Sequence, residues 1–166
     1  MKKICTRVVL PVIFLAFALS YPAIAQEKGH IELTCIAETE IETVNEKGEK
    51  EIQRVEASKV VPGDTVIYTI FYTVIGNDTV NDVVINNPIP EHMVYKGETA
   101  LGEGASVTFS IDGGKVFDSP ENLKVKDEED KERVAMASEY THIRWSLTHA
   151  VKPGQTGQVS YRAQLE

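Results

Sequence analysis

Apolar and polar residues alternate along several short segments of the chain, which is the pattern of β-strands that bury one face. Thr65–Ile75 is the clearest of these segments. One of its faces is wholly apolar and consists of Val66, Tyr68, Ile70, Tyr72 and Val74. Its other face is half apolar, so a central strand covered on both faces is expected. His30–Ala37 also alternates, with Ile31, Leu33, Cys35 and Ala37 on one side.

Turn residues separate these segments. Asn45–Gly48 predicts a hairpin between Glu40–Val44 and Gln53–Ala57, whose charges suit the edge of a sheet. Pro62–Asp64 and Gly76–Asp78 predict further turns. Strands separated by such turns at intervals of about ten residues predict an all-β, antiparallel sandwich of about seven to nine strands.

The second half of the chain continues the pattern. Val80–Asn86 is expected to be a strand that Pro88–Pro90 ends. Lys152–Gly154 predicts a turn that joins Thr141–His149 and Gly157–Leu165 into a closing hairpin. The charge run between residues 127 and 133 is interpreted as a solvated loop or one frayed helical turn.

Residues 1–25 have the pattern of a signal peptide. A basic start precedes the short apolar stretch Val8–Leu19, and Ala23–Ala25 ends the segment with small residues. A membrane anchor is the alternative. Gln26 follows the expected cleavage site where a lipoprotein would have cysteine. Export to the periplasm or the extracellular space is predicted, without stable membrane insertion after cleavage.

The predicted domain organisation follows from these segments. Residues 1–25 are the signal peptide, residues 26–59 supply N-terminal strands, and residues 60–166 form the core of the same domain. The whole chain has 17 Lys and Arg against 25 Asp and Glu, a formal charge of −8. Lys2, Lys3 and Arg7 leave with the signal peptide, so the mature chain is about −11, and it is expected to bind no nucleic acid.

The sequence offers no catalytic pattern. Its four histidines are scattered, and none has the spacing of a metal site. No nucleophile elbow, phosphate-binding loop or dinucleotide fingerprint is present. We therefore predict a protein that is not an enzyme and has no cofactor. One alternative is a calcium site built from loop acids that converge at one end of a sandwich, namely Asp64, Asp78, Asp82 and Asp112.

Three residues are assigned roles from their local pattern. Asp112 lies in Ser110–Phe117, which resembles an Asp-box hairpin, and it is expected to accept hydrogen bonds from its own turn. Trp145 shares a face with apolar neighbours and is expected to anchor the core. Cys35 is interpreted as a small core hydrophobe, with a thiol that pairs with another molecule as the alternative.

An ordered set of motifs resembles the bacterial surface-protein conserved repeat domain, a family of unknown function. The set runs through Pro62–Asp64, Tyr68, Gly76–Asn77, Val83–Ile85, Pro88–Pro90, Tyr140–Trp145 and Pro153–Gly154. It covers residues 60–165, and this chain holds a single copy. The resemblance implies an immunoglobulin-like β-sandwich. Asn87 stands where the family often has Asp, which weakens the case for a cation there.

The expected function is that of a non-enzymatic, exported structural or protein-interaction module of the cell envelope, because members of that family are chiefly surface modules. The partner is expected to be an envelope or extracellular protein. The alternatives are a module that binds calcium or a glycan, and a periplasmic assembly factor that pairs a strand edge with its partner. Met93 and Tyr95 are the candidate partner contacts, unless they cover one end of the core.

Overall fold

The computed structural model describes residues 29–166, and that part of the chain is an all-β protein. The signal peptide predicted at residues 1–25, with its cleavage site, lies outside the described residues. Two single turns of 3-10 helix, η1 (Pro120–Asn122) and η2 (Ala137–Glu139), accompany the strands. The strands are β1 (His30–Val44), β2 (Lys50–Glu56), β3 (Thr65–Ile75), β4 (Val84–Pro88), β5 (Met93–Tyr95), β6 (Leu101–Gly102), β7 (Ala105–Ser110), β8 (Lys124–Lys126), β9 (Glu132–Val134), β10 (His142–Leu147) and β11 (Thr156–Leu165).

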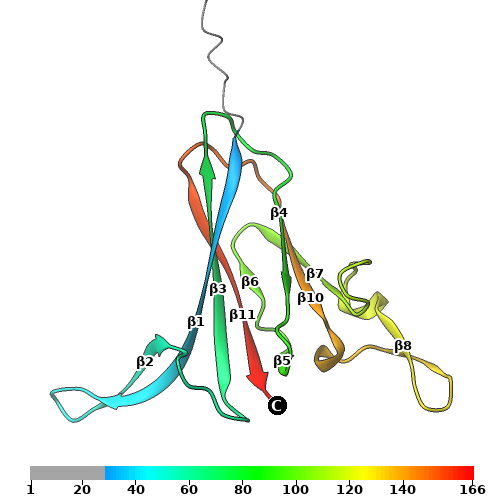
Figure 1. Ribbon diagram of the computed structural model, residues 1–166, viewed down its shortest axis with the longest axis horizontal. Helices are drawn as coiled ribbons and strands as arrows, with labels where there is room; N and C mark the ends of the chain where they lie inside the picture. The colour runs from blue at the N-terminus through cyan, green and yellow to red at the C-terminus, as the bar shows by residue number, and fades with distance from the viewer. Residues whose placement is uncertain (1–28) are drawn as a thin grey trace, which may run out of the picture.

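The strands form three antiparallel sheets (Figure 1). The large sheet has the order β2-β1-β3-β11-β5, and β6 also pairs with β11. The small sheet has the order β4-β10-β7, and β8 pairs with β9 as a separate ribbon. The described residues contain eleven strands, more than the seven to nine expected. Four of the eleven, β5, β6, β8 and β9, are only two or three residues long.

The core lies between the large and small sheets. Ile70, Val159 and Tyr161 from the large sheet share one buried cluster with Ile143 and Trp145 from the small sheet. Burial of these side chains is the main force that holds the two sheets together. The strand β3 lies between β1 and β11, and it is buried on both faces near its start, as the sequence predicted for a central strand.

The closing hairpin predicted from Lys152–Gly154 is wrong. The strand β10 pairs with β4 and β7 in the small sheet, whereas β11 pairs with β3 and β5 in the large sheet. The connection between them therefore crosses from one sheet to the other. The turn itself is present, because the N–H of Gln155 donates to the carbonyl of Lys152 at 3.0 Å. The strands β10 and β11 therefore bury their apolar faces in the same core, but from opposite sides of it.

Two parts of the chain extend beyond this core. The strand β1 is one continuous strand of 15 residues, where the sequence had indicated two, and its second half forms a ribbon with β2. On the opposite side of Figure 1 the β8–β9 hairpin projects. The charge run between residues 127 and 133 is neither wholly loop nor helical, because it includes part of β9.

In residues 29–166, the helical segments are single 3-10 turns, and none has the length and apolar character that a bilayer-crossing helix requires.

Candidate functional site

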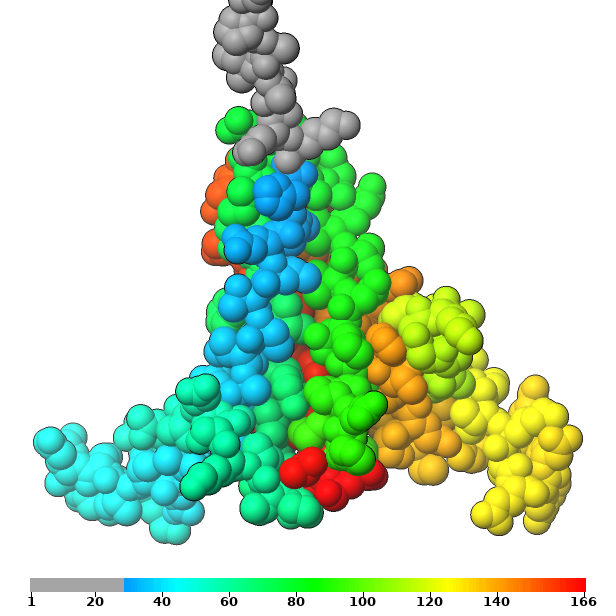
Figure 2. Space-filling model, viewed as in Figure 1, coloured from blue at the N-terminus to red at the C-terminus, as the bar shows by residue number. Residues whose placement is uncertain are grey.

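The first half of β1 has a free edge. The strand β3 pairs with β1 from His30 to Glu38, and β2 pairs with the opposite edge only from Glu38 to Val44. Within residues 29–166, no strand pairs with the outer edge of β1 between His30 and Ile36. We call this segment the free edge of β1. Below the grey atoms it lies at the surface in Figure 2, where β1 is blue.

The hydrogen-bonding direction of the free edge follows from its pairing. Ile31 lies opposite Val74, whose N–H and C=O are bonded to Gln155 and Gly154 on the other side of β3. Backbone groups alternate in direction along an antiparallel strand, so those of Ile31, Leu33 and Cys35 point away from β3. Further along, the carbonyl of Ala37 also points outward and accepts the N–H of Ala57 at 3.0 Å.

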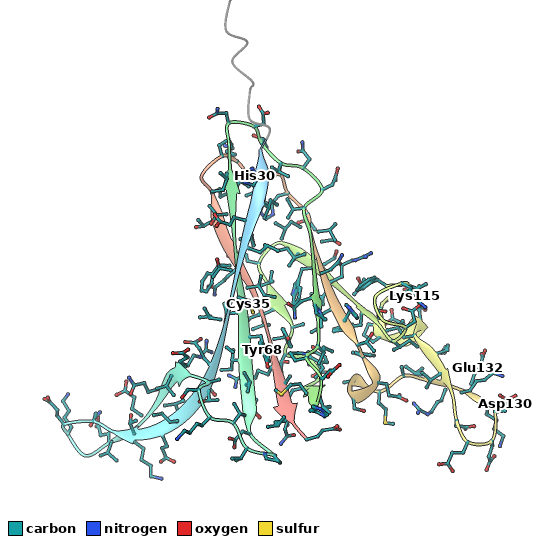
Figure 3. All side chains as sticks on the ribbon, in the orientation of Figure 1. His30, Cys35, Tyr68, Lys115, Asp130 and Glu132 are labelled. Atoms are coloured by element: carbon teal, nitrogen blue, oxygen red, sulfur yellow. The ribbon has the colours of Figure 1, made fainter. Side chains whose placement is uncertain are left out.

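The inner side chains of β1 face the side of the small sheet but are not covered by it. Leu33 is 49% exposed and Cys35 is exposed, although each lies directly opposite a buried β3 residue. Only Ile31 of β1 packs against the core cluster. The large sheet is therefore wider than the small sheet on this side. Figure 3 shows Cys35 on β1, with Tyr68 of β3 lower on the same sheet.

The expectation that Cys35 is a half-buried core residue is therefore wrong. Its position on the inner face was predicted from the alternation, but no part of the described chain covers that position. Partial desolvation next to Tyr68 nevertheless raises the pKa of the Cys35 thiol above its usual value. The thiol is thus accessible and less acidic than an ordinary cysteine.

The outer side of the same strand is acidic. Glu32 is exposed, and Glu38 lies directly opposite Glu56 of β2. None of these three carboxylates forms an ion pair within residues 29–166. Like charges that face each other across two strands destabilise the pairing. This end of the free edge therefore carries uncompensated negative charge.

Glu40, further along the acidic side, is compensated. The Arg162 guanidinium of β11 donates to both of its carboxylate oxygens at 2.8 and 3.0 Å, and Arg54 of β2 approaches to 3.4 Å. The hydrogen bonds from Arg162 hold the pKa of Glu40 below its usual range, with a smaller contribution from Arg54. On the outer side of β1, the carboxylates left without a cation are therefore Glu32 and Glu38, because Glu42 is paired with Lys50.

Tyr95, expected as an exposed partner contact, is a core residue. It is only 3% exposed, and its hydroxyl accepts the N–H groups of Thr99 and Ala100. Its ring packs near Phe109 and Tyr140, with centroids 5.3 and 6.1 Å away. Met93 is partly buried and also packs against the core. The alternative holds: this segment covers one end of the core, because β5 pairs with β11 and draws these side chains inward.

The other two residues singled out from the sequence are Trp145 and Asp112, and the contacts of both support a structural role. Trp145 is 0% exposed, and its indole Nε1 has no hydrogen-bond partner within residues 29–166. The Asp112 carboxylate accepts the N–H groups of Lys115 and Val116 at 3.0 Å and the Ser110 hydroxyl at 2.7 Å. These bonds hold the pKa of Asp112 below its usual value. Asp112 is therefore engaged within its own turn.

Apart from the free edge, the described residues form a cleft at the opposite end of the large sheet from the β2 ribbon. It is an open cleft of about 770 Å³ lined by residues that include Tyr72, Glu103, His149 and Gln158. Burial raises the pKa of Tyr72, with a smaller effect from Glu103. Within residues 29–166 no group of three or more His, Cys, Asp or Glu side chains is arranged to hold a metal ion, so the four loop acids do not gather.

Comparison with known proteins found no family model, no curated protein and no solved structure that matches this chain. The interpretation of the site therefore rests on the chain's own residues.

Proposed function

We propose that this chain is an exported, non-enzymatic module of the cell envelope or extracellular space that binds a protein partner. The fold proposed with this function is an immunoglobulin-like sandwich. Its support is the shared core between two antiparallel sheets, together with the ordered motifs between residues 60 and 165.

The observation that carries the proposal is the uncovered inner face of β1. Leu33 and Ile41 lie on the face whose alternation is typical of buried positions, yet they are 49% and 42% exposed. Burying apolar area contributes about 25 cal/mol per Å², so a strand of this pattern gains stability when another surface covers it. A contiguous uncovered apolar surface on a folded domain is typical of an interaction site.

A small-ligand module remains a second candidate, and the cleft beside Tyr72 favours it. That cleft holds a carboxylate on Glu103 and an imidazole on His149, which can hydrogen-bond the hydroxyl groups of a glycan. The cleft is open, however, and small-molecule sites bury most of their ligand. Protein binding along β1 is therefore the better supported of the two functions.

The experiment is crosslinking in intact cells, followed by reconstitution. The exported chain is captured after formaldehyde treatment, the crosslinked protein is identified, and both are purified and mixed. We expect a stable complex whose formation requires the folded domain. The control is Trp145→Ala, which empties a fully buried site and should abolish capture. Failure to reconstitute any complex, or a catalytic turnover abolished by one substitution, would overturn the proposal.

A further inference from the structure

We infer that the partner is held by strand addition: an extended segment pairs with the free edge of β1. Its inward side chains are apolar and cover Leu33 and Cys35. Its outward side chains are basic and lie beside Glu32 and Glu38. This inference rests on the proposed function, because it specifies how the protein partner is recognised.

The backbone of the free edge is the first part of the argument. Ile31, Leu33 and Cys35 each direct one N–H and one C=O away from β3. Adding a strand to such an edge satisfies these groups in register and gives affinity that does not depend on the partner's side chains. The pairing with β3 is continuous from His30 to Glu38, so no bulge interrupts the alternation of backbone groups along the edge.

The inner side chains are the second part. Every inward position of β1 from Ile31 to Thr43 is uncharged. Directly opposite residues on neighbouring strands share a face, so the inward side chains of an added strand would lie next to Leu33 and Cys35. Apolar side chains at alternate positions of the partner segment fit this surface.

The charge pattern identifies the other side of the partner segment. Glu32 faces outward on the free edge, and Glu38 with its opposite neighbour Glu56 lies at the end of that edge. Lysine or arginine at the outward positions of the added strand would neutralise these carboxylates. Opposite charges on directly opposed strand residues stabilise the pairing. The formal charge of −8 for the whole chain adds a long-range attraction for a basic segment.

Two other edge strands, β2 and β4, are protected in ways that the free edge of β1 lacks. The outer strand β2 carries Lys50, Glu51 and Arg54, and such charges oppose edge-to-edge pairing. The edge strand β4 ends at Pro88, which has no N–H and whose carbonyl accepts Asn87 Nδ2 at 2.7 Å. By contrast, the free edge holds a single acidic residue and no proline.

The test uses a synthetic peptide of about seven residues, the length of the free edge, with alternating valine and lysine. A second peptide replaces lysine with glutamate. A third keeps the valine–lysine sequence but carries N-methyl groups on two adjacent central residues, which blocks both of its edges. We expect the valine–lysine peptide to bind and each of the other two to bind about tenfold more weakly or not at all. Equal binding of the N-methylated peptide would overturn strand addition.

Two variants locate the binding. Leu33→Pro removes an N–H that points away from β3, so the β1–β3 ladder is kept and peptide binding should fall about tenfold or more. Glu32→Lys, which reverses the one acidic charge of the free edge, should reverse the preference in favour of the glutamate peptide. This readout holds even if Leu33→Pro fails to fold. Val116→Thr is the matched control, because Val116 is 61% exposed on the Asp112 turn, and it should bind as the unchanged protein does. Unchanged binding and preference in Glu32→Lys would overturn the inference.

The same variants separate this inference from the proposed function. If a reconstituted partner binds Leu33→Pro and Glu32→Lys as tightly as the unchanged protein, the protein is an interaction module that uses another surface, and strand addition is wrong. If no partner complex is reconstituted, the proposed function itself fails. A self-associated dimer that Leu33→Pro dissolves would contradict the basic partner, because the second strand would then come from an acidic copy of this chain.

Discussion

Arg162 and Glu40 form a two-pronged ion pair that reaches across β3. The guanidinium Nη2 lies 2.8 Å from Oε1 and Nη1 lies 3.0 Å from Oε2. Both side chains are on the outer face of the large sheet, where Ile67 of β3 pairs with Arg162 on one side and is only 3% exposed. The pair therefore joins β11 to β1 over an apolar residue, and it helps hold β1 in the sheet while leaving its other edge open.

We predict that this ion pair has a measurable coupling energy. Glu40→Gln and Arg162→Gln, combined in a double-mutant cycle, should give about 0.5–1 kcal/mol, the upper range for partly exposed pairs with two-pronged geometry. The pKa of Glu40 is lowered in the folded state. The coupling should thus be fully present above the unfolded pKa and should fade as pH falls below the usual glutamate range. Urea unfolding at neutral and acid pH measures it, and a coupling that grows on acidification would contradict the assignment.

A second ion pair sets the pKa of a carboxyl near β9. Nη1 and Nη2 of Arg133 donate to Glu139 at 2.6 and 2.7 Å, and the N–H of Met136 donates at 2.7 Å. These bonds, those from Arg133 first, lower the pKa of Glu139 to about 2. We predict that Arg133→Gln raises this pKa towards the usual glutamate value. An NMR titration of the Glu139 carboxyl measures the shift.

The sign of the resulting pH effect is fixed by the direction of the shift. Because the folded-state pKa of Glu139 is depressed, its contribution to stability is present above the ordinary glutamate pKa. It is lost as pH falls from that range to about 2. Arg133→Gln should therefore flatten the acid limb of the stability curve. An unchanged acid limb in this variant would show that the ion pair does not form in solution.

The buried indole of Trp145 gives the third prediction. Trp145→Ala should cost about 3–5 kcal/mol, the usual range for emptying a core aromatic site. Trp145→Phe should cost less, because it keeps most of the buried ring and removes an Nε1–H that has no partner within residues 29–166. Chemical unfolding of both variants measures the difference. Equal losses for the two variants, or readily quenched native tryptophan fluorescence, would contradict the packing.

The sequence predicted the strand faces well, because alternation is a local property of the pleated backbone. It identified the buried face of β3 and the turn role of Asp112. The hydrogen-bond partners of the Asp112 carboxylate are at most four residues away in the sequence. It did not predict that β10 and β11 lie in different sheets. Glycine and proline determine where a chain reverses, whereas the pairing of the next strand depends on the area that each sheet can bury.

The candidate site was missed for a related reason. The alternation of Leu33 and Cys35 specifies which side of β1 they occupy, but coverage of that side depends on the width of the opposite sheet. The small sheet ends at β4, a fact that only the full topology supplies. The signal that could have pointed to the site was the contrast between a nearly uncharged His30–Ala37 and the charged edge of Gln53–Ala57. The pairing of Glu40 with Arg162, so distant in sequence, leaves no local pattern.

Export is tested by the mass of the mature chain. We predict cleavage after Ala25, because Ala23–Ala25 follows a short apolar stretch with a basic start. The protein recovered from the periplasm or the medium should begin at Gln26 in an intact-mass measurement. Ala25→Leu is the informative variant, because it should delay cleavage without altering residues 29–166. Recovery of the full-length chain in washed membranes would favour the anchor alternative.

The thiol of Cys35 gives the final prediction, for the chain that begins at Gln26. Because Cys35 is exposed, a thiol reagent should label it completely without denaturant. Because desolvation raises its pKa, labelling near neutral pH should be slower than that of an unstructured cysteine peptide, and its rate should continue to rise to higher pH than the rate of that peptide does. A valine–lysine peptide bound along β1 should protect the thiol, whereas the N-methylated peptide should not. Labelling that requires denaturant would show that the inner face of β1 is already covered in the free protein, and protection by both peptides would show that binding does not use the backbone of the free edge.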